Sequence, residues 1–229
     1  MQPNSKGVTG IYIKTYSKVG EYHKSLGKGN EDNINVYQDE RYLFVAISDG
    51  AGSCPYAKEA AKSITDYSIQ YCKANSTRLF NCGYTQLKEK FRELLKYVRK
   101  MLNTTATKIG TNFKNMKGTL VLIMFDLVLG KYITLHIGDG VILEFEKPGL
   151  SNYRVISNAQ NGIDSRFTYF VNSDDIFNLM RVHKGNIAKH GYLICSDGLY
   201  QTRAMSGIIK DGFCLSKHED DCSFCVVML

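Results

Sequence analysis

The feature that most constrains this chain is an apolar run of strand length that ends in Asp-Gly, and it occurs three times. The runs are Phe44 to Gly50, Ile133 to Gly140 and Tyr192 to Gly198. Short apolar runs of this kind are typical of buried strands, so each one predicts a carboxylate at a strand tip. The glycine that follows leaves the next backbone carbonyl free of side-chain crowding. Oxygen atoms placed in this way suit a hard metal ion.

Length and composition fit one globular domain. The chain has 229 residues, of which 44% are hydrophobic and 22% charged, enough to bury a sizeable core. We therefore expect a single domain over residues 1–229. The formal net charge of +7 favours anionic partners. Charge alone does not choose among nucleic acid, a phosphoprotein and an anionic membrane, and it fits a merely solvated basic surface equally well.

Several features predict a cytoplasmic protein with reduced thiols. No apolar stretch approaches the roughly 20 residues that cross a bilayer, and residues 1–10 lack the order of a secretory signal. The seven cysteines are odd in number and scattered, which favours packing thiols over a disulfide framework. Cys222 and Cys225 form a Cys-x-x-Cys. Their odd separation on a strand points them to opposite faces, so we do not expect a zinc site there.

The order of apolar runs and turns predicts an α+β fold with two packed antiparallel sheets flanked by helices, a four-layer α-β-β-α sandwich. Hairpins outnumber strand-helix-strand units. One amphipathic helix is expected after Pro55 and a second around residues 87–102, with a loop at residues 75–83 between them. Residues 147–190 are polar and rich in turn signals, which predicts an irregular, flap-like excursion over the site.

Residues 33–47 predict a hairpin. If its turn centres on residues 39–40, antiparallel pairing sets Asp32 across from Ile47 and beside Asp49. An acid from one strand thus approaches an acid from the next.

Acidic residues from distant parts of the chain are predicted to meet at one edge of the sandwich. Asp197 closes a strand and Asp220 opens one, and in antiparallel neighbours a strand start and a strand end share one sheet edge. An Asp-Gly pair on its own is more often a turn than a ligand site, but the strands before these pairs favour convergence. The converging acids are Glu31, Asp32, Asp49, Asp139, Asp197 and Asp220.

Such a cluster of acids predicts bound cations. Carboxylates a few ångströms apart raise one another's pKa unless a cation neutralises them. Oxygen-only ligands favour Mg²⁺ or Mn²⁺ over zinc. Two ions bridged by a water would provide a hydroxide nucleophile at neutral pH and clamp an in-line displacement at phosphorus.

Six short motifs follow one another from about residue 30 to the C-terminus, and their order is informative. They are Asn30-Glu31-Asp32, Val45 to Gly52, Gly118-Thr119, Ile137-Gly138-Asp139, Ile194 to Leu199 and Asp220 to Ser223. No single one is specific, but their order resembles the PPM or type 2C family of metal-dependent serine/threonine protein phosphatases, in particular its smaller bacterial-type members.

The resemblance implies a protein-serine/threonine phosphatase that uses a metal-bridging water and forms no phosphoenzyme. It implies two Mg²⁺ or Mn²⁺ ions, and a third weaker one. The implied partners are a phosphorylated protein substrate and a cognate Ser/Thr kinase, with no nucleic acid and no membrane. The flap at about residues 147–190 would shape substrate choice.

The resemblance also implies roles for single residues. Asp49 and the Gly50 carbonyl would hold the bridged ion pair. Asp197 and Asp220 would complete one ion, and Asp139 would hold the third. Glu31 or Asp32 would hold or orient water at the second ion. These roles make Asp32 and Asp49 the implied catalytic residues.

Two departures keep an alternative open. Gly27 stands where many members have a phosphate-gripping arginine, and Lys28, the candidate to replace it, gives a point charge rather than a bidentate fork. Ala51 stands where some members have a histidine, and we expect ordinary surface or core roles for the five histidines. The alternative is a catalytically weak or inactive PPM-fold module that binds a phosphoprotein. A two-metal nuclease is a third reading, although no basic-aromatic stripe supports it.

Overall fold

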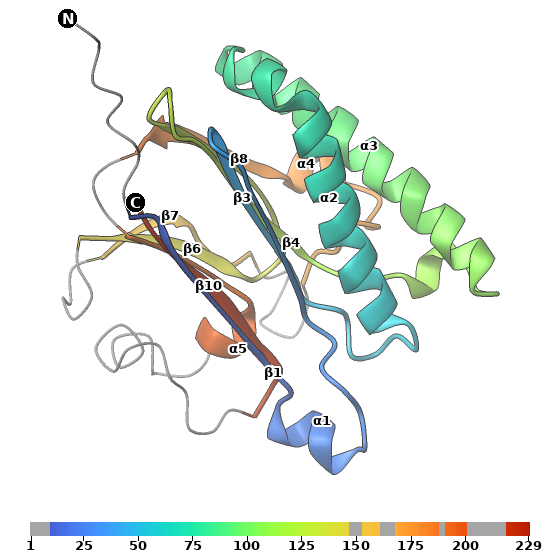
Figure 1. The fold of residues 1–229 in the computed structure, drawn as a ribbon. Helices are drawn as coiled ribbons and strands as arrows, with labels where there is room; N and C mark the ends of the chain where they lie inside the picture. Colours follow the sequence, from blue (N-terminus) through green and yellow to red (C-terminus); the bar gives the residue numbers. More distant parts are fainter. Residues whose placement is uncertain (1–9, 147–152, 161–167, 188–190, 201–218) are drawn as a thin grey trace, which may run out of the picture.

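Two five-stranded antiparallel sheets stacked face to face form the centre of the molecule (Figure 1). The computed structural model describes residues 10–146, 153–160, 168–187, 191–200 and 219–229. The sheet that contains the first and the last described strand, here the terminal sheet, runs in the order β1 (Tyr12–Lys18), β10 (Cys222–Met228), β9 (Gly191–Cys195), β6 (Val141–Phe145) and β7 (Tyr153–Ser157). The other, here the helix-covered sheet, runs β2 (Asn33–Gln38), β3 (Tyr42–Ser48), β4 (Leu120–Asp126), β5 (Lys131–Ile137) and β8 (Arg181–Asn186).

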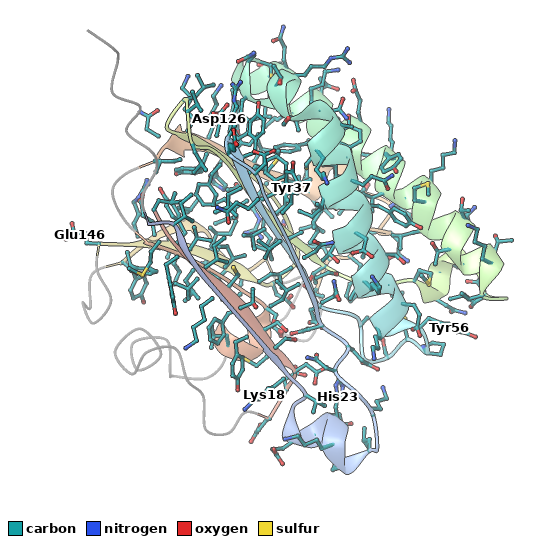
Figure 2. The ribbon with its side chains drawn as sticks, in the orientation of Figure 1. Lys18, His23, Tyr37, Tyr56, Asp126 and Glu146 are labelled. Atoms are coloured by element: carbon teal, nitrogen blue, oxygen red, sulfur yellow. The ribbon has the colours of Figure 1, made fainter. Side chains whose placement is uncertain are left out.

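Strand alternation divides the apolar side chains of the helix-covered sheet between two layers. Leu43 and Val45 of β3 pack between the sheets, against residues such as Tyr192 of β9. Phe44 and Ala46 of the same strand face the helices instead. Every residue of β3 is buried, as expected for a strand covered on both faces. Figure 2 shows side chains filling the space between the sheets and beneath α2.

Helical segments lie on the outer face of each sheet, which confirms the predicted sandwich. The long helices α2 (Ala57–Phe80) and α3 (Tyr84–Lys108) lie across the helix-covered sheet (Figure 1). On the outer face of the terminal sheet, the described residues contribute α5 (Asp197–Tyr200), whose Leu199 joins an apolar cluster with residues of β6, β9 and β10. The remaining helical pieces are α1 (Glu21–Ser25), the 3₁₀ turn η1 (Phe113–Asn115) and α4 (Ile176–Leu179).

Two expectations about connecting segments were wrong. The loop expected at residues 75–83 is helical as far as Phe80, because Leu79 and Phe80 are buried in the core and their packing outweighs the polar run before them. In the segment 147–190, the described residues 153–160 and 168–187 are more regular than expected, since they contribute β7, α4 and β8. Each of the two strands is an edge strand, and partial exposure at an edge gives its sequence the polar character of a loop. The rest of the expected excursion lies outside the described residues, and its role as a flap stays a prediction.

The β2–β3 hairpin turns one residue later than expected, which changes the register. The Asp39 N–H donates to the Tyr42 carbonyl at 2.9 Å, and Asp39 Oδ1 accepts hydrogen bonds from the N–H groups of Arg41 and Tyr42. The side chain of Asp39 thus fixes the turn. Asn33 pairs with Ser48, so Asp32 lies opposite Asp49 rather than opposite Ile47.

Two further features of the described residues bear on the sequence expectations. Six cysteines are free, and Cys222 and Cys225 belong to apolar clusters on opposite faces of the terminal sheet, as their spacing predicts. No helix in the ranges given above is long and apolar enough to cross a membrane.

The inter-sheet layer yields a stability prediction. Ile123 of β4 is fully buried there. Ile123→Ala should lower the free energy of unfolding by about 2–5 kcal/mol, since it removes buried methyl groups and leaves a cavity. Urea unfolding monitored by circular dichroism measures the loss. Val128→Ala is the matched control because Val128 is 70% exposed in the β4–β5 turn, and it should change stability by less than about 0.5 kcal/mol. Equal losses in the two variants would contradict the assigned layer.

Candidate metal centre

Three aspartates from three strand ends meet at one edge of the sandwich. Asp49 follows β3, Asp139 lies in the turn between β5 and β6, and Asp197 begins α5 directly after β9 and Ser196. Carboxylate oxygens of all three lie within 4.8 Å of one another. The structure thus brings together the acids of the three Asp-Gly runs that the sequence singles out.

The chain around Asp49 is fixed by backbone contacts. The Asp49 N–H donates to Thr119 Oγ1 at 3.0 Å, and the Thr119 N–H donates to the Asp49 carbonyl at 2.9 Å. Gly50 forms a bridge with Gly118, and a Cβ at Gly50 would collide with the backbone carbonyl of Ala57. Glycine is therefore required at position 50 by close backbone approach, which explains the first Asp-Gly pair.

Asp32 is the fourth acid of the cluster. It is 7% exposed, and its Oδ2 accepts a hydrogen bond from Ser196 Oγ at 2.9 Å. Its Oδ1 is buried without a hydrogen-bond partner, and so is Oδ1 of Asp139. Buried carboxylate oxygens without partners are costly unless a cation meets them. These two atoms, one on Asp139 of the cluster and one on Asp32 beside Asp49, fit a divalent ion with oxygen ligands.

The acids of the cluster perturb one another. Burial raises the pKa of Asp49 well above its usual range, and the charges of Asp32, Asp197 and Asp139 raise it further. Burial raises the pKa of Asp197 to about 8, with Asp139, Asp220 and Asp32 adding to the effect. Burial also raises the pKa of Asp32, to about 6, although its hydrogen bond from Ser196 opposes the shift. Cations would relieve this repulsion.

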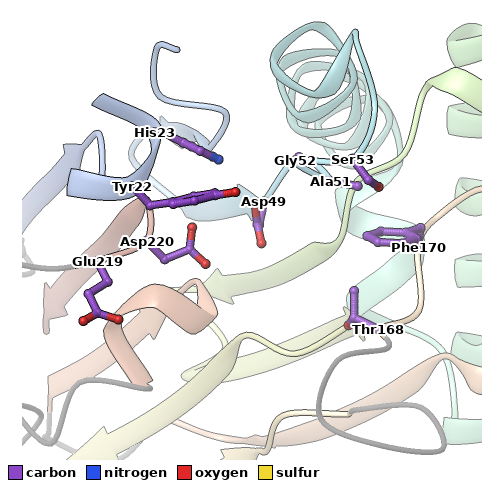
Figure 3. Close-up of a pocket in the computed structure, with 11 residues that line it drawn as sticks. Tyr22, His23, Asp49, Ala51, Gly52, Ser53, Thr168, Phe170, Glu219 and Asp220 are labelled. Carbon is purple, nitrogen blue, oxygen red and sulfur yellow. The ribbon is translucent and has the colours of Figure 1, made fainter. Parts of the chain in front are cut away.

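Asp220 lies on the open side of the cluster. It is exposed, and it lines a cavity of about 570 Å³ together with Asp49 (Figure 3). Its charge contributes to the raised pKa values of Asp139 and Asp197. It therefore acts on the cluster from the cavity wall, and its role as a ligand stays a prediction.

Glu31 and Lys28 lie toward α1 rather than among the aspartates. Glu31 Oε1 is 3.3 Å from Lys28 Nζ, and Glu31 Oε2 is 3.7 Å from His23 Nε2. Lys28 Nζ also donates to the Gly52 carbonyl at 2.9 Å. The ammonium of Lys28 is thus shared with a carboxylate and a carbonyl at the cavity rim. A ligand role for Glu31 and a phosphate contact for Lys28 stay predictions, as does the ligand role of the Gly50 carbonyl.

Sequence reasoning missed Asp221 and His23. Asp221 is 3% exposed and accepts the N–H groups of Gly20 at 2.8 Å and Glu31 at 2.6 Å. Its Oδ2 lies 2.9 Å from His23 Nδ1, and His23 lines the cavity. Asp221 therefore ties β10 to α1 and to the start of β2. Its position beside Asp220 was the one available signal, whereas no motif marks His23, for which we expected an ordinary role.

Arg181 supports the turn that carries Asp139 and was also missed. Its Nη2 donates to the Gly138 carbonyl at 2.9 Å and lies 3.1 Å from His136 Nδ1, which is 2.7 Å from Ser157 Oγ. Burial raises the pKa of Asp139, and the positive charge of Arg181 opposes that shift. Arg181 reaches this place because β8 pairs with β5, a pairing that no motif in the sequence announces.

A two-sheet sandwich with acids gathered at one edge is the architecture of PPM-type phosphatases. The protein-family model described as Protein phosphatase 2C matches residues 19–220, and the chain belongs to this family. No curated protein sequence matches it.

Solved structures of bacterial proteins share the fold. Serine/threonine phosphatase Stp1 from Staphylococcus aureus is 14% identical with a TM-score of 0.72, and the match covers 100% of this chain and 99% of that one. RsbX in complex with magnesium is 14% identical, with a TM-score of 0.62 over 96% of this chain and 95% of that one. PppA, a key regulatory component of the T6SS in Pseudomonas aeruginosa, is 19% identical, with a TM-score of 0.63 over 95% and 97%. At these identities the likeness concerns the fold.

The raised pKa values predict an unusual pH dependence of stability. A group whose pKa is raised on folding stabilises the protein below its unfolded pKa, and that stabilisation is lost as pH rises through the folded pKa. For Asp32, at about 6, and Asp197, at about 8, the loss falls between about pH 4 and pH 8. Without metal, the melting temperature should therefore fall from pH 5 to pH 8. Added Mn²⁺ should raise it most at pH 8, where the carboxylates ionise.

Differential scanning fluorimetry in chelator and in Mn²⁺ measures both slopes. Asp197→Asn removes one carboxylate of the cluster and leaves the other charged groups of the protein unchanged. It should therefore flatten the dependence of the melting temperature on pH in chelator and abolish most of the increase in melting temperature that Mn²⁺ gives. A wild-type melting temperature that rises with pH in chelator, or an unchanged slope in Asp197→Asn, would contradict the assigned repulsion.

Proposed function

We propose that this chain is a metal-dependent phosphoprotein phosphatase that hydrolyses phosphoserine and phosphothreonine, with two Mg²⁺ or Mn²⁺ ions and a third, weaker one. The observation that carries the proposal is the cluster of Asp49, Asp139 and Asp197. Two buried, unpartnered carboxylate oxygens beside it, one each from Asp32 and Asp139, fit cations of this kind. Membership of the Protein phosphatase 2C family supports the same chemistry.

The residues of the cluster have separable roles in this proposal. The aspartates would hold the ions, which when bound supply an activated water for attack at phosphorus and neutralise charge on the phosphate. Asp32 is suited to orient that water and accept its proton, because its Oδ1 is buried and unpartnered. Its hydrogen bond from Ser196 keeps the carboxyl group in place.

Direct attack by water, without a phosphoenzyme, agrees with the state of the cysteines. A cysteine nucleophile needs a depressed pKa and access to solvent. Cys222 and Cys225 are buried instead, and burial raises the pKa of each to about 12. Among the described residues, no cysteine lines the cavity at the carboxylates.

A second candidate is a weak or inactive regulatory module that binds a phosphoprotein. Gly27 offers no side chain to grip phosphate, and no arginine or lysine is among the described residues that line the cavity. Lys28 is engaged by Glu31 and by the Gly52 carbonyl. PppA, which shares the fold, is described as a regulatory component. The retained aspartates favour the enzyme over the module.

The proposal extends to partners and location. A phosphorylated protein is the substrate, and a cognate Ser/Thr kinase supplies it. The reaction requires neither nucleic acid nor a membrane. A cytoplasmic location stays a prediction.

Loss of single aspartates tests the enzyme. Purified protein should hydrolyse phosphoserine and phosphothreonine peptides with Mn²⁺ or Mg²⁺ and stop in chelator. Asp49→Asn or Asp197→Asn should lower kcat/KM by more than about 100-fold, since loss of a residue that merely orients a metal ligand costs about 10–100-fold. The readout is released inorganic phosphate. Asp66→Asn, an isosteric change on α2 at a residue that contacts Asn35 and Lys62 and does not line the cavity, should leave turnover within about twofold.

Other outcomes discriminate the candidates. If the wild type turns over none of these substrates but retains a phosphopeptide in pull-down, the regulatory module replaces the enzyme. Cleavage of single-stranded DNA or RNA that is lost in Asp49→Asn would favour a nuclease.

A further inference from the structure

The cavity above the carboxylates is larger than a phosphate group needs. Its volume of about 570 Å³ lies in the range of about 300–1,000 Å³ typical of sites that enclose a whole ligand. The aspartates occupy one part of its wall, and the rest comes from α1, the segment after Asp49 and the chain around Thr168 (Figure 3). Those other walls contribute to recognition of a ligand rather than to the chemistry at the carboxylates.

Tyr22 of α1 forms one wall. It is 61% exposed, and in Figure 3 its ring extends into the cavity with the hydroxyl directed toward Asp49. Its N–H donates to the Glu219 carbonyl at 3.0 Å, and the N–H of Gly20 donates to Asp221 at 2.8 Å. The exposed ring of Tyr22 gains no stability from packing in the core. The backbone of α1 is nevertheless held by hydrogen bonds to the residues that lead into β10. Tyrosine in this setting offers apolar area at low entropic cost.

Phe170 forms the facing wall. Its N–H donates to Ser173 Oγ at 3.0 Å, and the N–H of the next residue, the fully buried Val171, donates to the Gly118 carbonyl at 2.9 Å. Gly118 in turn bridges Gly50. The second ring is therefore fixed to the same backbone that holds Asp49, so both walls keep their place relative to the carboxylates.

The two walls differ in charge. Glu219 is exposed beside Tyr22 and lines the cavity. On the other side, Lys117 Nζ lies 5.9 Å from the centroid of the Phe170 ring. Lys117 does not line the cavity, so a bound chain would meet the negative charge of Glu219 at the Tyr22 end and no lysine or arginine of the described residues at the Phe170 end. This difference gives the chain a preferred direction.

We propose, on the basis of the function proposed above, that this cavity selects phosphoprotein segments with an apolar side chain next to the phosphorylated residue and a basic residue facing Glu219. The apolar side chain packs between Tyr22 and Phe170. The phosphorylated residue reaches the carboxylates, and the basic residue points toward α1. A small phosphate monoester reaches the carboxylates without using either ring, so the preference is for extended peptide.

Three synthetic substrates test this selection. The first is a phosphoserine peptide with leucine beside the phosphoserine and arginine at the end expected to face Glu219. The second replaces leucine by glycine, and the third is N-acetyl phosphoserine methylamide, which has no neighbours. Wild type should prefer the first over the second by about 10-fold in kcat/KM, mainly through KM, since apolar contacts of this size are worth about 10–200-fold.

Variants assign the preference to its walls. Tyr22→Ala and Phe170→Ala should each reduce the leucine-to-glycine preference to about twofold. Glu219→Gln should reduce the preference for arginine over glutamate in the first peptide, and more so at low salt. Tyr84→Ala is the matched control, since Tyr84 is 50% exposed on α3 and does not line this cavity. It should leave every ratio unchanged.

The outcomes separate this inference from the proposed function. Equal turnover of all three substrates, or ratios unaffected by Tyr22→Ala and Phe170→Ala, would overturn the inference while the phosphatase stands. If no substrate turns over, fluorescence anisotropy of the labelled peptides measures binding instead. If the wild type then binds the leucine peptide more tightly than the glycine peptide, and the two alanine variants do not, the selection by the cavity stands although the proposed phosphatase activity does not. If the wild type shows no such difference in binding, both proposals are overturned.

Discussion

The structure depends on a constraint that folding imposes: four aspartates are gathered at one sheet edge, where burial raises the pKa of each and the charges of neighbouring acids raise the pKa of Asp49 and Asp197 further. The pKa of Asp49 is raised by burial and by the charges of Asp32, Asp197 and Asp139 together. A cluster of this kind lowers the stability of the metal-free fold, so it persists only because packing elsewhere offsets it. The inter-sheet layer and the helix-covered face supply that packing with continuous apolar surface. Affinity for divalent cations follows from the same repulsion.

Hydrogen bonds made by the backbone at and around the acids, rather than attraction between the clustered carboxylates, hold the acids together. Asp49 is fixed through both its N–H and its carbonyl by Thr119. Asp221, which does not belong to the cluster, anchors the start of β2 and the start of α1 by accepting their N–H groups. Gly198 has a related role, since a Cβ there would collide with the Asp221 carbonyl. The glycines after the aspartates thus permit close approach between chain segments whose charged neighbours repel.

The same anchors extend outward to the cavity walls. Through Asp221 the β10 edge fixes α1 and hence Tyr22, and through Gly118 the Asp49 corner fixes the segment of Phe170. In the proposed function, the carboxylates and the cavity walls therefore share one frame, and a substrate chain held by the walls would be positioned relative to the carboxylates. Such positioning contributes to catalysis by reducing the entropy lost at the reacting centre.

The sequence by itself determined the strands that end in Asp-Gly, the acids at their tips and the family, because apolar runs ending in Asp-Gly are local signals that packing preserves. It also predicted that Asp49, Asp139 and Asp197 meet. Only the tertiary structure decided that Asp32 lies opposite Asp49, since the Asp39 side chain sets a turn that periodicity does not fix. It alone revealed His23, Asp221 and Arg181, whose partners lie tens to hundreds of positions away in the chain. Hydrogen bonds between such distant segments form only after the sheets pair, and no short motif records them.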